Sequence, residues 1–194
     1  MSTSSFRDSA HAAAEVKNPS AIFLSRHGEP VPGSVTLVTR EGTRPMLVEV
    51  QALVDRSLSQ SPRRVAQGVD AQRLGLLLAV LHRHCGIDIG DSDVFANVVG
   101  GMRVTETAVD LALCLAMLSS FRELALDSDL VVFGEVGLTG EIRPVPFGEE
   151  RLSEAAKHGF KRALVPQANA PRRDLGLEVI PVRRLADALT EVRT

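Results

Sequence analysis

The order of elements between residues 94 and 161 constrains the fold of this chain most strongly. A β-branched stretch at residues 94–99 runs directly into two glycines, where the backbone must turn tightly or lie close to another segment. The next apolar segment has a wide hydrophobic face and predicts a central helix. A short apolar strand at residues 130–133, a glycine-punctuated hairpin and an amphipathic stretch at residues 149–158 complete the series. This order predicts a mixed α/β fold.

Two strands and a helix are expected ahead of this series. Residues 34–39 and 46–54 are β-branched and alternate in polarity, and the polar turn between them predicts an antiparallel hairpin. Residues 56–67 are polar and rich in turn formers, so we expect a loop there. Leucines at helical spacing in residues 69–84 then predict a helix, with Asp70 as its N-cap and Gly86 closing it.

The C-terminal third predicts two more strands and a last helix. Residues 163–166 and 177–181 are short strand-like stretches, and residues 182–192 place four apolar side chains on one helix face. At the head of the central helix, Thr107 and Asp110 have the spacing of a capping box, in which each side chain bonds a free backbone N–H. Hairpins and crossovers together indicate the class α/β, of mixed α+β type.

Composition bounds the possible partners. The chain has 194 residues, of which 44% are hydrophobic and 24% charged, and this suits one compact domain with a hydrophobic core. A formal charge of −2 gives no global attraction to nucleic acid, so DNA contact requires a local basic patch. No apolar run approaches the ~18 residues of a membrane helix. We therefore expect a soluble protein of the cytoplasm, without a membrane partner.

The N-terminal residues and the spacing of cysteines and glycines bear on the expected domains and cofactors. We expect a mobile arm or linker over residues 1–17, which are rich in Ser and Ala, and one domain over residues 18–194. Cys85 and Cys114 have neither CxxC spacing nor partner histidines, and predict reduced thiols rather than a metal site. Neither a GxxxxGKS/T loop nor a GxGxxG turn between strand and helix occurs. No nucleotide, metal or other cofactor is therefore expected in this chain.

Four longer sequence words carry a resemblance to a known family. They are FLSRHGE at residues 23–29, RPMLVEVQALV at 44–54, NVVGG at 97–101 and VVFGEVG at 131–137. In these words and in the order of its elements, the chain resembles the C-terminal Lon-protease-like domain of the bacterial DNA repair protein RadA, also called Sms. The resemblance implies the fold shared by the proteolytic domain of Lon and the second domain of ribosomal protein S5.

The resemblance also implies partners. Intact proteins of that family add an N-terminal four-cysteine zinc finger and a RecA-like ATPase core, and this chain has neither part, so ATP, Mg²⁺ and Zn²⁺ are implied only for those parts. For the part present, the resemblance implies a homo-oligomeric ring, expected to be a hexamer. Such a ring contacts single-stranded or branched DNA and acts with RecA recombinase on branched recombination intermediates.

Protease chemistry can be tested on the residues themselves. Lon-type proteases use a serine nucleophile whose proton is taken by a lysine amine, so the two side chains must lie within hydrogen-bond reach. In the family the serine begins the helix after the glycine turn, and the lysine begins the helix after the second hairpin. Laying this chain along that order places Ala108 at the serine position and Glu149 at the lysine position. The three lysines of the chain lie elsewhere, at Lys17, Lys157 and Lys161.

The resemblance therefore implies a protease fold without a protease dyad, acting as a non-catalytic scaffold. The hydroxyls of Thr105 and Thr107 keep a second hypothesis open, a residual Ser/Thr peptidase of the Lon fold. A third is a purely structural oligomerisation module. The candidate DNA-binding residues flank one strand and its following loop, where their charges can neutralise phosphates. They are Lys161, Arg162, Arg172 and Arg173.

Overall fold

The computed structural model describes residues 29–192, so the arm expected at residues 1–17 and the expected domain start at residue 18 lie outside the described part. The strands are β1 (Ser34–Glu41), β2 (Arg44–Arg56), β3 (Arg64–Gln67), β4 (Ser92–Val98), β5 (Leu130–Val132), β6 (Glu135–Val136), β7 (Ile142–Arg143), β8 (Arg162–Pro166) and β9 (Glu178–Val182). The α-helices are α1 (Ala71–Cys85), α2 (Asp110–Arg122), α3 (Gly148–Lys157) and α4 (Leu185–Glu191). Three short 3₁₀ turns are η2 (Val99–Gly101), η3 (Thr107–Val109) and η4 (Gln167–Asn169). The fold is mixed α/β, as predicted.

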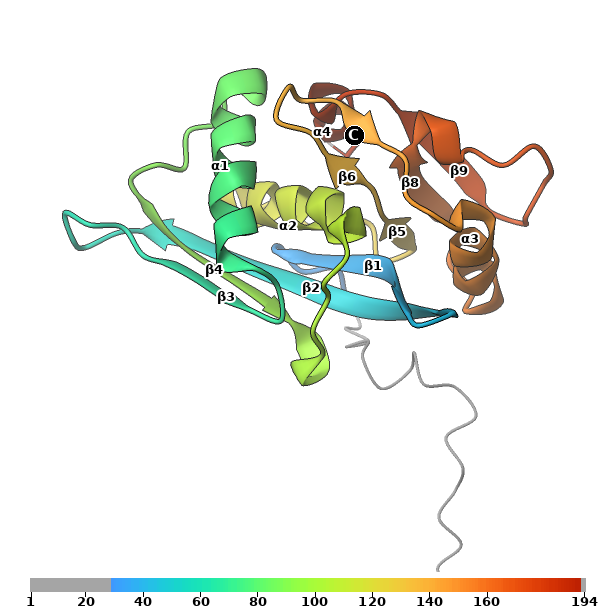
Figure 1. Cartoon of the computed structure of the whole chain (residues 1–194). Coiled ribbons are helices and arrows are strands. Elements are labelled where there is room, and N and C mark those ends of the chain that lie inside the picture. The colour runs from blue at the N-terminus through green and yellow to red at the C-terminus, as the bar shows by residue number, and fades with distance from the viewer. Residues whose placement is uncertain (1–28, 193–194) are drawn as a thin grey trace, which may run out of the picture.

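One seven-stranded sheet organises the described residues, with the strand order β3-β4-β2-β1-β5-β8-β9. β1 and β2 form the predicted antiparallel hairpin, in which Val38 lies opposite Leu47. β5, β8 and β9 pair in parallel, so crossover connections link them. The short pair β6 and β7 is the predicted glycine-punctuated hairpin. In Figure 1, α1 and α2 lie on the same face of the sheet, and α3 lies beside the end of β1.

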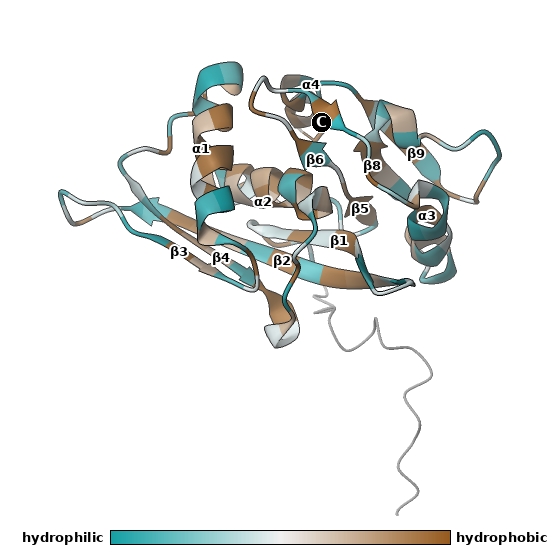
Figure 2. Cartoon of the chain, viewed as in Figure 1, coloured by the Kyte–Doolittle hydropathy of each residue, from teal (hydrophilic) through white to brown (hydrophobic). Residues whose placement is uncertain are grey.

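The helix α2 is the centre of the hydrophobic core. Every residue from Asp110 to Ser119 is buried, so the helix is covered on all sides rather than along one stripe. It packs across β1 and β2, and α1, η3 and β6 also contact it. Figure 2 shows hydrophobic colours along α2 and hydrophilic colours over much of α3. The prediction of a central helix is confirmed.

Local signals mark both ends of α1 correctly. Asp70 has an extended backbone, and its side chain accepts a hydrogen bond of 2.9 Å from the backbone N–H of Gln72. At the other end, Gly86 adopts a left-handed conformation with a φ of 66°, which closes the helix. Gly159 plays a similar part after α3, with a φ of 84°. These ends depend on neighbouring residues alone, which is why the sequence predicts them.

The structure departs from the sequence prediction at two places. β2 extends to Arg56, and β3 occupies residues 64–67, where we expected a loop. β3 pairs in parallel with β4, so that Val65 lies beside Phe95, and this pairing joins residues 30 positions apart. The last helix begins at Leu185 rather than at residue 182, because Val182 belongs to β9. In both cases strand pairing over a long sequence distance overrides the local pattern.

The burial of α2 predicts a large cost for a cavity in it. Leu115 is 0% exposed, and Leu115→Ala should lower the free energy of unfolding by about 3 kcal/mol, since the methyl groups removed leave a hole. The chain contains no Trp or Tyr, so urea unfolding is followed by circular dichroism. Leu138→Ala, at a side chain 62% exposed, is the control and should change stability by less than about 0.5 kcal/mol. Equal effects of the two substitutions would contradict the central position of α2.

Candidate functional site

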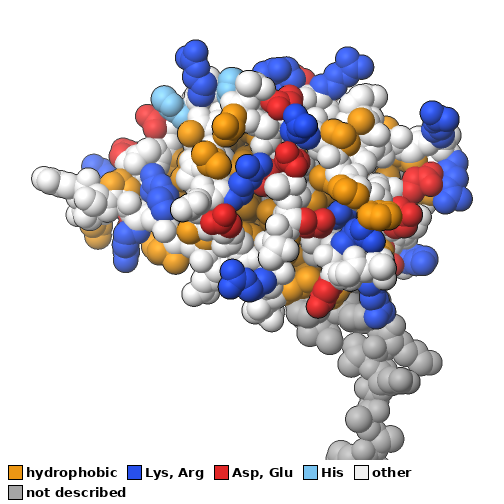
Figure 3. All heavy atoms as spheres, viewed as in Figure 1, with side chains coloured by type: hydrophobic (Ala, Val, Ile, Leu, Met, Phe, Trp, Pro, Cys, Tyr) orange, Lys and Arg blue, Asp and Glu red, His pale blue; other side chains and the backbone are white. Residues whose placement is uncertain are grey.

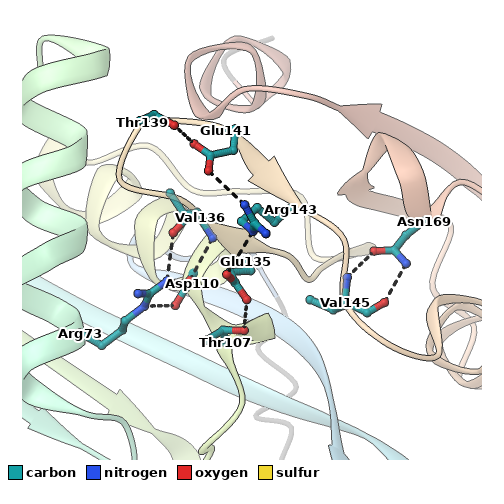
Figure 4. A network of polar contacts seen from close by, with 10 residues as sticks. All are labelled: Arg73, Thr107, Asp110, Glu135, Val136, Thr139, Glu141, Arg143, Val145 and Asn169. Carbon is teal, nitrogen blue, oxygen red and sulfur yellow. Dashed lines mark hydrogen bonds and ion pairs between the residues drawn. The ribbon is translucent and has the colours of Figure 1, made fainter.

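Asp110 is a fully buried acid at the start of α2. Arg73 of α1 contacts both of its carboxylate oxygens, with Nε 2.9 Å from Oδ1. The backbone N–H of Val136 donates to the same carboxylate at 3.0 Å, and Arg73 donates to the carbonyl oxygen of Val136 at 2.9 Å (Figure 4). Asp110 therefore ties together α1, α2 and β6, which are far apart in the sequence.

The predicted capping box at Thr107 and Asp110 is wrong. Both side chains bond partners from other elements: Asp110 bonds Arg73, and Thr107 donates its hydroxyl hydrogen to Glu135 of β6. The helix α2 continues directly from η3 and has no side-chain cap. The backbone N–H of Leu111 donates instead to the carbonyl oxygen of Gly134 at 3.0 Å. The hairpin backbone thus satisfies a donor that the capping box was expected to satisfy.

Burial and hydrogen bonding shift the pKa of Asp110 in opposite directions. Burial raises the pKa of Asp110 above its usual value, and the hydrogen bonds from Arg73 and Val136 oppose that rise. The hydrogen bond to Asp110 in turn raises the pKa of Arg73, so the guanidinium remains charged. Because Arg73 holds both oxygens of Asp110, the carboxylate acts as a structural partner and not as a free base.

The hairpin of β6 and β7 carries a more exposed ionic cluster. Arg143 lies 3.4 Å from Glu135 and 3.6 Å from Glu141, and Thr139 donates to Glu141 (Figure 4). The hydrogen bond from Thr139 lowers the pKa of Glu141. Arg143 is 58% exposed, so these pairs orient the hairpin surface and add little stability.

A second ion pair joins Arg151 of α3 to Glu106, the residue that precedes η3. The side chain of Arg151 is 0% exposed, and it donates two hydrogen bonds of 2.7 Å to the carboxylate of Glu106. Arg151 also donates to the carbonyl oxygens of Pro146 and Val38, each at 3.0 Å. Glu106 accepts two further bonds, 2.8 Å from the hydroxyl of Thr39 and 3.1 Å from the backbone N–H of Arg40.

The environment of Glu106 keeps it ionised. Burial alone raises the pKa of a carboxyl, but the bonds from Arg151 and Thr39 outweigh it and hold the pKa of Glu106 below its usual value. The sequence prediction missed this pair. Only the apolar setting of Arg151 in an amphipathic helix hinted at it, since its partner lies 45 positions away.

The two positions of the Lon-type dyad lie in η3 and at the start of α3. Ala108 lies in η3, 1% exposed, and its carbonyl oxygen accepts a 2.9 Å bond from the backbone N–H of Gly134. Glu149 lies in the first turn of α3, and its carboxylate is 3.4 Å from Nε of Arg173. Lys157 is the last residue of α3 and Lys161 precedes β8. Within residues 29–192, neither lysine makes a hydrogen bond to a hydroxyl.

The candidate DNA-binding residues lie along β8 and the loop that follows it. Arg162 is the first residue of β8, where it lies 3.6 Å from Asp127 and 3.4 Å from Glu178. Arg173 lies in the exposed loop between η4 and β9, beside Glu149. Lys161 and Arg172 are exposed. Two of the four charges are therefore shared with carboxylates, and the assignment to DNA stays a prediction.

The two cysteines are not joined by a disulfide in the described part of the chain. Burial raises the pKa of the Cys114 thiol well above its usual value. In the described part of the chain, no three His, Cys, Asp or Glu side chains are grouped to hold a metal ion. No helix among the described residues has the length and apolar character needed to cross a membrane.

The pair of Glu106 and Arg151 predicts a pH-dependent loss of stability. Glu106→Gln leaves a buried guanidinium without its counter-charge, and should lower the free energy of unfolding at pH 7 by about 3 kcal/mol. The folded-state pKa of Glu106 is depressed, so its contribution is present above the unfolded pKa and is lost as the pH falls through the folded value. The difference from wild type should therefore shrink between about pH 5 and pH 3 in urea titrations. Glu41→Gln, at an exposed position, is the control; a constant difference for Glu106→Gln would contradict the pairing.

Comparison with known proteins identifies the domain. The chain matches the family model described as subunit ChlI of Mg-chelatase over residues 38–169, more than half of its length. It is 63% identical over 177 residues to the DNA repair protein RadA of Escherichia coli K12, and the aligned region covers 91% of this chain and 38% of that protein. The RadA proteins of Pseudomonas aeruginosa and Aquifex aeolicus are 65% and 49% identical, each over 90% of this chain and 39% of their own length. The chain thus spans less than two fifths of the length of these relatives. It belongs to the ChlI family and corresponds to a domain of RadA proteins.

Proposed function

We propose that this domain is a non-catalytic scaffold and DNA-contact domain of a RadA-type DNA repair protein. The support for the repair role is the identity of 63% to a protein named DNA repair protein RadA, extending over 91% of the chain. The observation that carries the non-catalytic part is the content of the two dyad positions. A buried methyl group at Ala108 and an acid at Glu149, held by Arg173, offer neither a nucleophile nor an amine base.

Two arginines near η3 support the same proposal. Arg73 and Arg151 each make a bidentate pair with an acid that flanks η3. A guanidinium does not lose its proton in proteins, so neither arginine can replace the lysine of a Lon-type dyad. The site is therefore suited to holding elements together and not to proton transfer.

DNA contact would be local rather than spread over the surface. The face seen in Figure 3 shows Lys and Arg side chains interspersed with Asp and Glu, without one large basic area. The loop with Arg172 and Arg173 is the exposed basic segment that we assign to phosphate contact. In the proposed setting the domain forms part of a homo-oligomeric ring, expected to be a hexamer, that acts in the cytoplasm with RecA on branched intermediates. ATP, Mg²⁺ and Zn²⁺ would be bound by other parts of the longer protein.

The salt dependence of DNA binding tests this proposal. Arg172→Ala/Arg173→Ala should weaken binding to a single-stranded oligonucleotide and flatten the plot of log affinity against log salt by about 1.4, because two fewer counterions are released. Fluorescence anisotropy of a labelled oligonucleotide measures both quantities. Arg183→Ala/Arg184→Ala removes the same charge from another exposed pair and is the control. An unchanged slope in the first variant would contradict the assignment of the loop to DNA contact. Absence of DNA binding by the wild type would favour a purely structural oligomerisation module.

A residual peptidase is the second candidate, because the Thr107 hydroxyl donates to the Glu135 carboxylate. This carboxylate is also paired with Arg143, so we expect no cleavage of unfolded casein and no adduct with a serine-reactive phosphonate. Mass spectrometry after incubation measures the adduct. Thr107→Val lacks the hydroxyl and is the control. An adduct on wild type that is lost in this variant would overturn the non-catalytic proposal.

A further inference from the structure

An arginine and a phenylalanine form an exposed stack where α3 begins. The guanidinium carbon of Arg40, near the end of β1, lies 3.5 Å from the centroid of the Phe147 ring. Phe147 is 50% exposed, so its ring is not part of the core. Its backbone has a φ of 62°, in the left-handed region that bulky residues rarely adopt. The fold therefore holds an aromatic ring at the surface in a conformation that is intrinsically unfavourable.

The cation in this stack has no acidic partner among the residues that the structure describes. Nε of Arg40 is buried and has no hydrogen-bond partner, and within residues 29–192 the Arg40 side chain makes no ion pair. The nearest acid in the bonding network is Glu106, which accepts the backbone N–H of Arg40 at 3.1 Å. Both oxygens of Glu106 are already held by Arg151. A buried donor without an acceptor costs free energy, so the Arg40 side chain is held in this stack at a cost.

The stack adjoins the basic loop that we assign to DNA. Glu149, two residues after Phe147, is 3.4 Å from Nε of Arg173. The acids close to the stack are thus partly neutralised by arginines, although Glu150 remains exposed in the same turn of α3. Electrostatic attraction alone would therefore be modest here, and stacking on the ring would supply most of the affinity.

We propose that Arg40 and Phe147 bind one nucleotide of single-stranded DNA. The base stacks on the exposed surface of the Phe147 ring, and a phosphate oxygen accepts a hydrogen bond from the Arg40 guanidinium. Aromatic stacking with an adjacent arginine is a sequence-tolerant way to bind single strands, because every base has a π face. A duplex keeps its bases stacked inside and cannot use the ring. This inference rests on the proposed DNA contact and gives it a residue-level site.

The absence of Trp and Tyr from the chain allows a direct test. Phe147→Trp makes a protein with one tryptophan, placed in the stack. Its fluorescence should be quenched when unlabelled oligo(dT) of 20 nucleotides is added, and a duplex of equal length should not quench it. Phe121→Trp is the matched control, since Phe121 is 40% exposed at the end of α2. Quenching of both proteins, or of neither, would overturn the stacking site.

Affinity measurements complete the test. Phe147→Leu keeps apolar bulk and loses the π face, and it should bind oligo(dT) about tenfold more weakly, whereas Phe147→Tyr should bind like wild type. Arg40→Ala should also weaken binding, and Arg83→Ala, at an exposed arginine of α1, should not. If Phe147→Leu binds normally while Arg172→Ala/Arg173→Ala does not, the inference fails and the proposed function stands. If wild type binds no DNA, both fail. Displacement of oligo(dT) by millimolar AMP would identify a free-nucleotide site and overturn the assignment to a strand.

Discussion

The ion pair between Arg151 and Glu106 is the interaction on which the junction of β1 and α3 depends. β1 and β5 pair at Leu37 and Val132, after which β5 leaves the edge of β1. The carbonyl oxygen of Val38 then needs another donor, and Arg151 supplies it at 3.0 Å. Taking a guanidinium out of water is expensive, and it is tolerated here because a carboxylate and two backbone carbonyls occupy its donors. The carbonyl oxygen of β1 and the guanidinium of α3 thus satisfy each other's hydrogen-bonding needs.

The pairing of Arg151 with Glu106 also bears on whether the region can transfer protons. A general base must release its proton near neutral pH, and burial can lower the pKa of a lysine enough for this. An arginine keeps its charge in the same setting, and two bonds to a carboxylate fix its orientation. Asp110 and Arg73 repeat the arrangement at the other side of η3. The buried Asp110 and the partly exposed Glu106 are each paired with a guanidinium group, and this supports the proposed non-catalytic role.

The sequence predicted what depends on neighbours and missed what depends on distant partners. The ends of α1 follow from Asp70 and Gly86, and the β1–β2 hairpin follows from alternation around a polar turn. β3 was missed because four residues carry too weak a pattern and their partner strand lies about 30 positions later. The capping box failed for a related reason, since Thr107 and Asp110 bond β6 and α1 and not their own helix. The ion pair between Arg151 of α3 and Glu106, which precedes η3, could not be predicted from residue spacing.

The turn that carries the strained surface residue Phe147 is bonded to Arg151 of this ion pair. Arg151 donates its backbone N–H to the carbonyl oxygen of Phe147 at 3.2 Å and its Nε to that of Pro146 at 3.0 Å. One residue thereby fixes two consecutive carbonyls of the turn that enters α3. The same turn contains Phe147 in the left-handed region, which costs on the order of 1 kcal/mol. Its ring lies beside Arg40 and outside the core, so a bond from the buried side chain of Arg151 helps to hold the turn that carries an exposed aromatic side chain.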